Sequence, residues 1–345
     1  MKKITVYGAY GHTGRFVVAE LLKRGLTPIL SGRDAGKLNA IGAKYPGLEV
    51  RKASVDNPSS LDRSLNGAAA VINCAGPFLD TAIPIVKAAV KARIHYLDVT
   101  AEQPVALALF EQFANIARDA GTVIMPAMAF YGGLGDLLAT AAVGNWPEVD
   151  EIRIAVALDS WKPTLGTRIT GQRNAARRFI FSNNRLEFLA DPAPTRTWDF
   201  PEPFGTQDVV GLALAEIVTI SRHLCSPEIH PYMNLLPLTD LRDPDTPAPT
   251  AVDESGRSSQ VFLMDVIVTK DDKKRRATAS GRDIYAITAP IVVEATERIL
   301  KGEFKTSGAV VAGEIFDAED FLFALSDSGL SFKTHDELSN TAGGT

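Results

Sequence analysis

The chain has 345 residues, of which 46% are hydrophobic and 22% are charged. These values are typical of an ordinary globular protein, and the length favours two domains over one. The net charge of −5 provides no general attraction to nucleic acid or to an anionic membrane surface, so neither is expected as a partner.

Cysteine usage and the distribution of apolar residues indicate the cellular setting. The two cysteines, Cys74 and Cys225, are too few for a disulfide framework. No signal peptide precedes the first predicted strand, and no apolar run is long enough to span a membrane. A reduced, cytoplasmic setting is therefore expected.

Residues 1–34 are the most informative stretch of the chain. Residues 3–7 are an apolar and β-branched run, residues 8–14 (GAYGHTG) are punctuated by glycine, and residues 15–24 carry apolar side chains at helical spacing. Residues 27–31 have the composition of a second strand. A strand, turn, helix and strand in this order is typical of a nucleotide-binding βαβ unit.

The glycine spacing in this turn, G-x-x-G-x-x-G, favours a dinucleotide. Gly8 would let the chain leave the strand sharply, Gly11 would let backbone N–H groups approach a pyrophosphate, and Gly14 would let the helix pack closely on the sheet. The unpaired N–H groups at the start of the helix would attract the phosphates. The predicted cofactor contacts here are Gly8, Tyr10, Gly11, His12, Thr13 and Gly14. The alternative is a glycine-rich turn without a ligand.

The end of the second predicted strand indicates which dinucleotide is preferred. Ser31 offers a hydroxyl, Arg33 offers a planar guanidinium suited to a 2′-phosphate, and Lys37 could add positive charge. Asp34 has two interpretations, as the cap of the next helix or as an acceptor for the ribose. We expect the cap and NADP as the cofactor, with NAD as the less favoured alternative.

Four further strands are predicted at residues 48–53, 69–74, 94–99 and 122–125, with helices between them. Six strands that alternate with helices predict a doubly wound parallel sheet. The loop after the fourth strand is expected beside the ribose and nicotinamide, unless it is an ordinary strand-to-helix turn; it comprises Cys74, Ala75, Gly76, Pro77 and Phe78. Asp56, after the third strand, lies either near the adenine or in a simple turn.

The pattern changes after residue 126. The expected elements are strands at 151–158 and 185–189, a helix at 167–181, a strand or helix at 206–223, a long loop at 237–259 and a hairpin at 260–281. Helices at 285–301 and 318–325 could pack back on the first domain. Residues 1–126 with 283–335 are thus expected to form a dinucleotide-binding domain. Residues 127–282 would be an inserted α+β domain for substrate binding and dimerisation, whose hydrophobic strands favour a homodimer.

Four segments in the first third of the chain resemble one known family. They are residues 8–14 (GAYGHTG), 31–34 (SGRD), 71–78 (VINCAGPF) and 96–102 (YLDVTAE). In this order they resemble the saccharopine dehydrogenase-like family of NAD(P)-binding oxidoreductases, which includes the trans-acting enoyl reductases. The resemblance implies a Rossmann domain of the α/β class with an inserted domain that bears the substrate site. No family motif is recognised after Asp136.

Hydride transfer requires a proton donor or acceptor near the carboxyl ends of the strands. Tyr131, on the loop after the sixth strand, is the leading candidate, followed by Asp98, Glu102 and Asp136. Each has a structural alternative. Tyr131 could be a packing residue, Asp98 a strand-end cap, Glu102 a solvated loop residue and Asp136 a helix cap.

Basic residues of the second domain could hold an anionic substrate. The predicted helix of residues 167–181 carries Arg168, Arg173, Arg177 and Arg178. Arg173 and Arg177 share a face because they are four residues apart. The alternative is a solvated basic face. Trp161, just before this helix, could close a substrate pocket or belong to the core.

The sequence lacks the motifs of several other enzyme classes. The chain has no Tyr-x-x-x-Lys pair and no Gly-x-Ser-x-Gly elbow, and its histidines lack metal-ligand spacing, so no metal is expected. What remains is an NADP(H)-dependent oxidoreductase that acts on a small carbonyl, imine or conjugated alkene. The alternatives are an NADP-binding regulator without catalysis and a trans-acting reductase partner without stand-alone activity.

Overall fold

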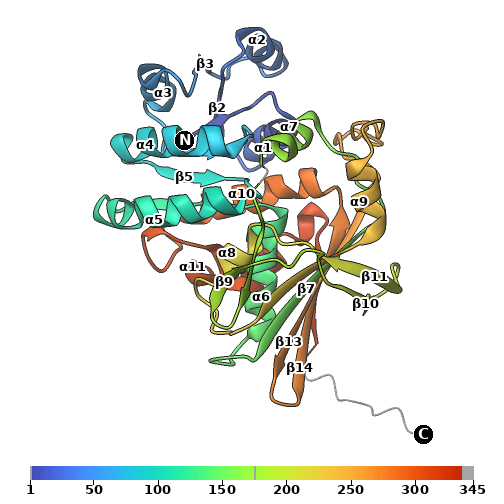
Figure 1. The fold of residues 1–345 in the computed structure, drawn as a ribbon. Helices are drawn as coiled ribbons and strands as arrows, with labels where there is room; N and C mark the ends of the chain where they lie inside the picture. Colours follow the sequence, from blue (N-terminus) through green and yellow to red (C-terminus); the bar gives the residue numbers. More distant parts are fainter. Residues whose placement is uncertain (1, 175, 336–345) are drawn as a thin grey trace, which may run out of the picture.

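A computed structural model describes residues 2–174 and 176–335 of the chain. Two β-sheets form its framework, one built mostly from the first third of the chain and one from the remainder (Figure 1). The blue and cyan helices surround the first sheet in the upper part of the view, and the green-to-orange strands of the second sheet spread below it. The predicted α/β class, with a doubly wound sheet and a second α+β domain, is confirmed.

Within the described residues the first sheet has seven parallel strands in the order β15-β6-β5-β4-β1-β2-β3. The strands are β1 (Lys3–Tyr7), β2 (Thr27–Gly32), β3 (Val50–Lys52), β4 (Ala70–Asn73), β5 (His95–Asp98), β6 (Val123–Met125) and β15 (Gly308–Ala309). The helices between them are α1 (His12–Lys23), α2 (Ala35–Lys44), α3 (Pro58–Leu65), α4 (Phe78–Ala92) and α5 (Gln103–Asp119). The strand order reverses between β1 and β4, so the loops after these two strands open toward a common crevice.

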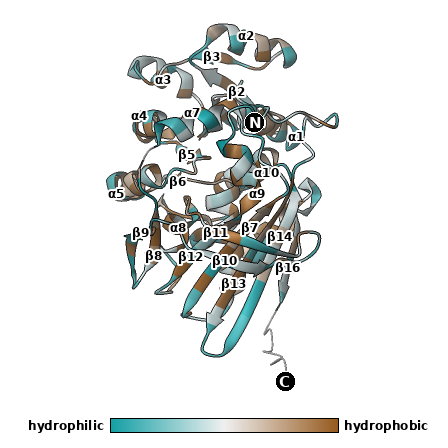
Figure 2. Cartoon of the chain, turned by 45° about the vertical axis from the view of Figure 1, so that its right-hand side comes forward, coloured by the Kyte–Doolittle hydropathy of each residue, from teal (hydrophilic) through white to brown (hydrophobic). Residues whose placement is uncertain are grey.

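The second sheet comprises nine described strands and is mostly antiparallel, with β12 and β7 as a parallel pair. The strands are β7 (Glu151–Leu158), β8 (Phe179–Ser182), β9 (Arg185–Phe188), β10 (Thr195–Asp199), β11 (Thr206–Gly211), β12 (Ile229–Asn234), β13 (Val261–Lys270), β14 (Lys273–Arg282) and β16 (Ser331–His335). The predicted hairpin is confirmed as β13 and β14, and its charged turn is the hydrophilic tip at the bottom of Figure 2.

Helices of the later chain lie on or between the two sheets. They are the π-helical turn η1 (Phe130–Leu134), α6 (Gly135–Val143), α7 (Leu165–Arg173), α8 (Glu216–Ile220), α9 (Leu235–Arg242), α10 (Ile284–Lys301), α11 (Ala312–Ile315), α12 (Ala318–Ala324) and the short turn η2 (Ser326–Ser328). Helix α6 packs on β13 and β14, whereas α10 packs on α1 and also contacts β5 and β14. No helix of the described residues is both long and apolar enough to cross a membrane.

One hydrophobic core joins the two sheets. The buried side chains of Ile4 and Val6 on β1 belong to the same cluster as those of Val266 and Val268 on β13. Burial of this apolar surface holds the two domains against each other, because separating them would return it to water. The crevice between the domains is therefore bounded by a fixed framework on both sides.

The structure differs from the sequence prediction in the later part of the chain. The helix predicted at 167–181 is α7, which ends at Arg173, and the region 206–223 contains both a strand and a helix. Helix α9 occupies the start of the predicted loop at 237–259. The C-terminal segment expected with the first domain contributes β15 to the first sheet and β16 to the second. These strands were missed because β15 has two residues and β16 is polar and mostly exposed, so neither shows a periodic pattern.

Candidate functional site

A cavity of about 990 Å³ lies between the two domains. Its first-domain wall is formed by the loops after β1, β2, β4 and β5, and its opposite wall by η1, α7 and the start of α10. The volume is of the size of pockets that enclose a cofactor or a drug-sized ligand. The carboxyl ends of the parallel strands and the second domain thus face one cavity.

The glycine loop after β1 leaves room for a ligand at its surface. Gly8 has a φ of +85°, and its N–H donates to the Ser31 carbonyl at 2.8 Å, which turns the chain sharply after the strand. A Cβ added at Gly11 would lie 3.1 Å from the Gly8 carbonyl oxygen. No side chain caps α1, and His12 and Thr13 at the start of this helix line the cavity, so its first N–H groups have no side-chain acceptor there. This arrangement fits a pyrophosphate.

Gly14 serves packing and does not line the cavity. A Cβ at this position would lie 2.2 Å from the Gly8 carbonyl oxygen, so only glycine permits the close approach of α1 to the end of β1. This is the role that the glycine spacing predicts for the third position.

The end of β2 forms the second part of the cavity wall. Arg33 and Lys37 line the cavity, and the Tyr10 ring covers Gly32 so closely that a Cβ there would be 2.7 Å from a ring carbon. The Asp34 carboxylate accepts from the Lys37 N–H at 3.0 Å and caps α2, which is the preferred of its two predicted roles. Arg33 therefore offers its charge to an anionic group at the cavity wall, whereas the Lys37 Nζ lies 3.9 Å from the Asp34 carboxylate.

Besides Gly14, two expected cofactor contacts do not line the cavity. The Ser31 side chain is fully buried, and its hydroxyl donates to the Arg51 carbonyl at 2.9 Å, because β3 pairs with β2 at this position. Asp56 is bonded to the neighbouring Ser54 hydroxyl at 3.3 Å in an exposed turn, which corresponds to the simpler of its two interpretations.

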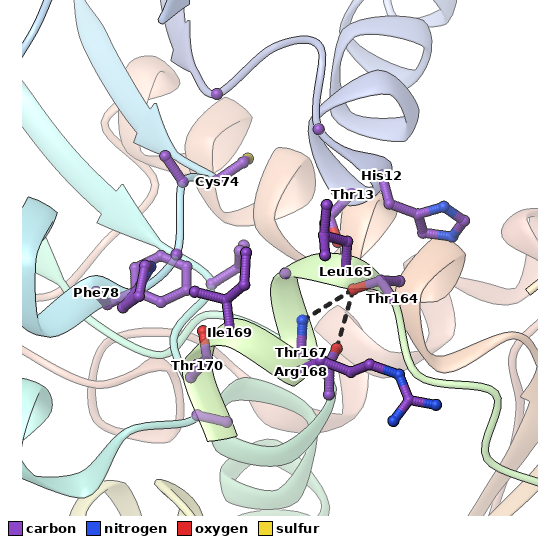
Figure 3. A pocket seen from close by; sticks show the side chains of 18 of the residues that line it. His12, Thr13, Cys74, Phe78, Thr164, Leu165, Thr167, Arg168, Ile169 and Thr170 are labelled. Atoms are coloured by element: carbon purple, nitrogen blue, oxygen red, sulfur yellow. Dashed lines mark hydrogen bonds between the residues drawn. The ribbon is translucent and has the colours of Figure 1, made fainter. Parts of the chain in front are cut away.

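The loop after β4 lines the cavity along its whole predicted length, from Cys74 to Phe78. Burial raises the pKa of the Cys74 thiol, so this side chain is an uncharged part of the wall. A Cβ on Gly76 would lie 2.9 Å from the Thr170 hydroxyl oxygen of α7. Helix α7 thus packs directly over this loop, and Figure 3 shows its side chains Leu165, Ile169 and Thr170 around the pocket.

Two of the three carboxylates proposed as proton donors, Asp98 and Glu102, have structural partners. Asp98 is fully buried away from the cavity, and it accepts hydrogen bonds from the N–H groups of Ala127 at 2.8 Å and Thr100 at 3.0 Å. Burial raises its pKa to about 6. Glu102 lines the cavity, but its carboxylate accepts from the N–H groups of Phe78 and Leu79 at the start of α4. Burial raises the pKa of Glu102, and these two N–H groups oppose the rise.

Tyr131 is the sequence-predicted catalytic candidate with a free functional group. It lies in η1 and lines the cavity, and its buried hydroxyl has no hydrogen-bond partner among residues 2–174 and 176–335. Burial raises its pKa well above the usual value. The fourth candidate, Asp136, is fully buried and accepts from the Gly313 N–H at 2.7 Å, with His223 2.6 Å away.

Of the residues predicted to contact the substrate, some line the cavity and one does not. Trp161 lines the cavity, and its Nε1 donates to the Tyr285 hydroxyl at 2.9 Å. Arg168 also lines the cavity, but it donates to the carbonyls of Asp243 and Thr246. Arg173 lies outside, in an ion pair with Asp80 of α4 at 3.1 Å. Because α7 ends early, the chain turns and brings Arg178 to the cavity wall, which the helical prediction could not show.

Metal ligands are not gathered anywhere in the described part of the chain. No group of three or more His, Cys, Asp or Glu side chains there is arranged to hold a metal ion. The free cysteines, Cys74 and Cys225, lie on different domains.

Comparison with known proteins identifies relatives of the first domain. Residues 4–125 match the family model for the saccharopine dehydrogenase NADP binding domain. The chain is 27% identical over 211 residues to a probable mitochondrial saccharopine dehydrogenase-like oxidoreductase of Arabidopsis thaliana, a match that covers 56% of this chain and 46% of that protein. It is 27% identical over 212 residues to the trans-acting enoyl reductase of Mycobacterium ulcerans, covering 58% and 51% respectively. The chain thus spans about half the length of these relatives.

A solved structure shares the fold over nearly the whole chain. The apo saccharopine dehydrogenase (L-Glu forming) of Saccharomyces cerevisiae superposes with a TM-score of 0.69 at 14% identity. The match covers 97% of this chain and 100% of that one. At this identity the likeness shows a common fold.

Proposed function

Because residues 4–125 match the family model for the saccharopine dehydrogenase NADP binding domain, we propose that the protein is an NADP(H)-dependent oxidoreductase. It would transfer hydride to or from a small carbonyl, imine or conjugated alkene. The observation that carries this proposal is one cavity that is lined both by the glycine loop and Arg33 and by Tyr131. A nucleotide and a small substrate bound there would share one enclosed space.

The residues of the cavity fit each part of the cofactor. The N–H groups at the start of α1 would hold the pyrophosphate, since no side chain caps this helix. Arg33 and Lys37 would hold the 2′-phosphate, because Asp34 is engaged as a cap and a guanidinium matches phosphate geometry. The loop of Gly76, Pro77 and Phe78 would lie along the nicotinamide ribose. A nicotinamide bound there supplies hydride-transfer chemistry.

Tyr131 would hold the proton that the reaction exchanges. Because burial raises its pKa well above the usual value, its hydroxyl stays protonated at neutral pH. An oxygen or nitrogen of the substrate that becomes negatively charged is a stronger base than a phenolate, so it would take this proton. Trp161 and Tyr285, joined by their hydrogen bond, form a wall beside Tyr131 that excludes water.

The cofactor assignment is tested by fluorescence titration with NADPH and NADH at matched salt. We expect the wild-type protein to bind NADPH at least tenfold more tightly than NADH. Arg33→Ala should weaken NADPH binding by about tenfold or more and NADH binding much less, since only NADPH carries the 2′-phosphate. Lys44→Ala, on the same helix as Lys37 but outside the cavity, is the control. Equal losses for both nucleotides in Arg33→Ala would reject the NADP assignment.

The catalytic assignment is tested by NADPH oxidation with a panel of carbonyl, imine and enoyl substrates. Tyr131→Phe should lower turnover by about a hundredfold while NADPH affinity stays the same, as for loss of a general acid. Tyr232→Phe, in the second sheet and away from the cavity, is the control. Unchanged turnover in Tyr131→Phe would make Tyr131 a packing residue. Turnover that requires a carrier-bound substrate would support the trans-acting alternative, and NADPH binding without any turnover would support the regulator.

The homodimer and the cytoplasmic location expected from the sequence stay predictions. Light scattering on the purified protein tests the first, and localisation of the full-length protein in its cell tests the second. A monomer at micromolar concentration would contradict the homodimer.

A further inference from the structure

A tyrosine of the glycine loop occupies the place where a side chain at the end of β2 would lie. Gly32 is the last residue of β2 and offers no side chain of its own. A Cβ added at Gly32 would lie 2.7 Å from the Tyr10 Cε1, 3.2 Å from its Cζ and 3.3 Å from its hydroxyl oxygen. The phenol end of Tyr10 therefore fills the space next to the end of this strand.

In a dinucleotide fold this strand end faces the adenosine ribose. NAD enzymes place an Asp or Glu about 20 residues after the glycine motif, where its carboxylate accepts a hydrogen bond from the ribose 2′-hydroxyl. The last two residues of β2 offer no such group here, since Gly32 has no side chain and the Ser31 hydroxyl is engaged with the Arg51 carbonyl. Asp34, the next acidic residue, caps α2. The Tyr10 hydroxyl thus stands where NAD enzymes have a carboxylate.

The hydrogen bonding of the Tyr10 hydroxyl determines which partner it can take. The Asp34 N–H donates to the hydroxyl oxygen at 3.3 Å. No group of residues 2–174 or 176–335 accepts the phenolic proton in return. Tyr10 and Gly32 both line the cavity. Because its oxygen already accepts from the backbone, the hydroxyl is left to donate to a ligand in the cavity.

The charges beside this hydroxyl favour an anionic acceptor. Arg33 lines the cavity, and the Lys37 Nζ lies 5.9 Å from the centroid of the Tyr10 ring. Asp34 is the only acidic residue in the sequence of β2 and α2, residues 27–44, and its carboxylate lies 3.9 Å from the Lys37 Nζ. One carboxylate beside two basic side chains leaves an excess of positive charge at this strand end. A phosphate there would therefore be more favourable than a neutral hydroxyl.

We propose that the Tyr10 hydroxyl donates a hydrogen bond to the 2′-phosphate of NADP(H), and that this bond helps to set the preference for NADP(H) over NAD(H). Arg33 would supply charge, whereas Tyr10 would supply a donor held in place by the Asp34 N–H. With NAD(H) the same hydroxyl would meet a neutral ribose hydroxyl. A hydrogen bond to a charged oxygen is roughly twice as strong as one to a neutral oxygen. This inference rests on the proposed NADP(H)-dependent function and adds a residue that determines cofactor specificity.

Tyr10→Phe tests this role, because it removes the hydroxyl and keeps the ring over Gly32. Calorimetry measures the binding of adenosine 2′,5′-bisphosphate and adenosine 5′-monophosphate, which differ only in the 2′-phosphate, and fluorescence titration measures NADPH and NADH. We expect the variant to bind the bisphosphate and NADPH about tenfold more weakly, and the monophosphate and NADH at most about twofold more weakly. Tyr45→Phe, at the end of α2 and outside the cavity, is the matched control and should leave all four affinities unchanged.

The four affinities separate this inference from a packing role and from the proposed function. Equal losses for all four ligands in Tyr10→Phe would show that Tyr10 only shapes the loop. Unchanged affinities would show that its hydroxyl does not reach the phosphate. Either result would overturn this inference and leave the NADP assignment in place, provided that wild-type protein prefers NADPH. Wild-type protein that binds NADPH no more tightly than NADH would overturn both proposals.

Discussion

The Glu102 carboxylate accepts hydrogen bonds from the backbone N–H of Phe78 at 2.8 Å and from that of Leu79 at 3.2 Å. These are the first residues of α4, so a side chain at the start of α5 caps the neighbouring helix. A negative charge at a helix N-terminus is favourable because it satisfies unpaired N–H groups and interacts with the helix dipole. The loop that would carry the nicotinamide is thereby fixed to the next strand-helix unit.

Glu102→Gln tests this capping role. The amide keeps one acceptor and turns an NH₂ group toward a backbone donor, which leaves one N–H of α4 without an acceptor, so we expect the free energy of unfolding to fall by about 1–2 kcal/mol. Urea unfolding at neutral pH measures the change. Glu111→Gln, at an exposed position of the same helix α5, should change stability by less than about 0.5 kcal/mol. Equal stability of Glu102→Gln and wild type would contradict the cap.

Gly14→Ala tests the close packing of α1 on β1. The new Cβ would lie 2.2 Å from the Gly8 carbonyl oxygen and 3.1 Å from the Ala9 Cα, and backbone atoms cannot move aside as a flexible side chain can. We expect a loss of about 3 kcal/mol or more in stability. Gly171→Ala on α7 is the control, because nothing lies within 4 Å of its Cβ position. Equal thermal unfolding temperatures of Gly14→Ala and Gly171→Ala would show that α1 does not require glycine at position 14 to pack on β1.

Glu216→Gln tests the effect of a buried carboxylate on the pH dependence of stability. Burial raises the pKa of Glu216 from 4.5 to about 7, against the opposing effects of the Leu214 N–H and of Arg178. The folded protein therefore binds this proton more tightly than the unfolded chain, so the contribution of Glu216 to stability falls as the pH rises from about 4.5 to about 7. The Glu216→Gln variant has no titrating group at this position, so its stability does not fall in this way as the pH rises.

The stability of Glu216→Gln relative to wild type should thus increase by about 3 kcal/mol between pH 4.5 and pH 7.5. Urea unfolding of both proteins at several pH values gives the difference. A difference that stays constant with pH, or that changes in the opposite direction, would show that Glu216 titrates normally.

Arg173→Ala tests the closure of α7 over the cavity. This helix has no buried residue, and its ion pair with Asp80 connects it to α4 at 3.1 Å. Both side chains are exposed, so the pair contributes little to stability and is weakened by salt. We expect NADPH to leave the variant about two- to fivefold faster than wild type in stopped-flow displacement at low salt, with the difference lost near 1 M salt. Identical release rates at low salt would mean that the pair does not hold α7 closed.

Local sequence patterns determined the first domain and its glycine loop. The apolar run of β1, the glycines at 8, 11 and 14 and the amphipathic face of α1 are neighbours in sequence, and their geometry depends on residues a few positions apart. The same holds for the hairpin of β13 and β14, whose strands are joined by a short charged turn. Tyr131 could likewise be placed near the strand ends, because it follows β6 directly.

Only the tertiary structure decided which side chains remain available to a ligand. Asp98 ends β5, and Glu102 and Tyr131 follow strands of the same sheet, but Asp98 and Glu102 receive N–H partners from other segments and the Tyr131 hydroxyl has none among the described residues. Arg178 reaches the cavity because α7 ends at Arg173 and Gln103, 76 residues before Phe179, clamps the chain that follows. Hydrogen bonds between distant segments leave no periodic trace in the sequence, since each needs the folded chain to bring its partners together.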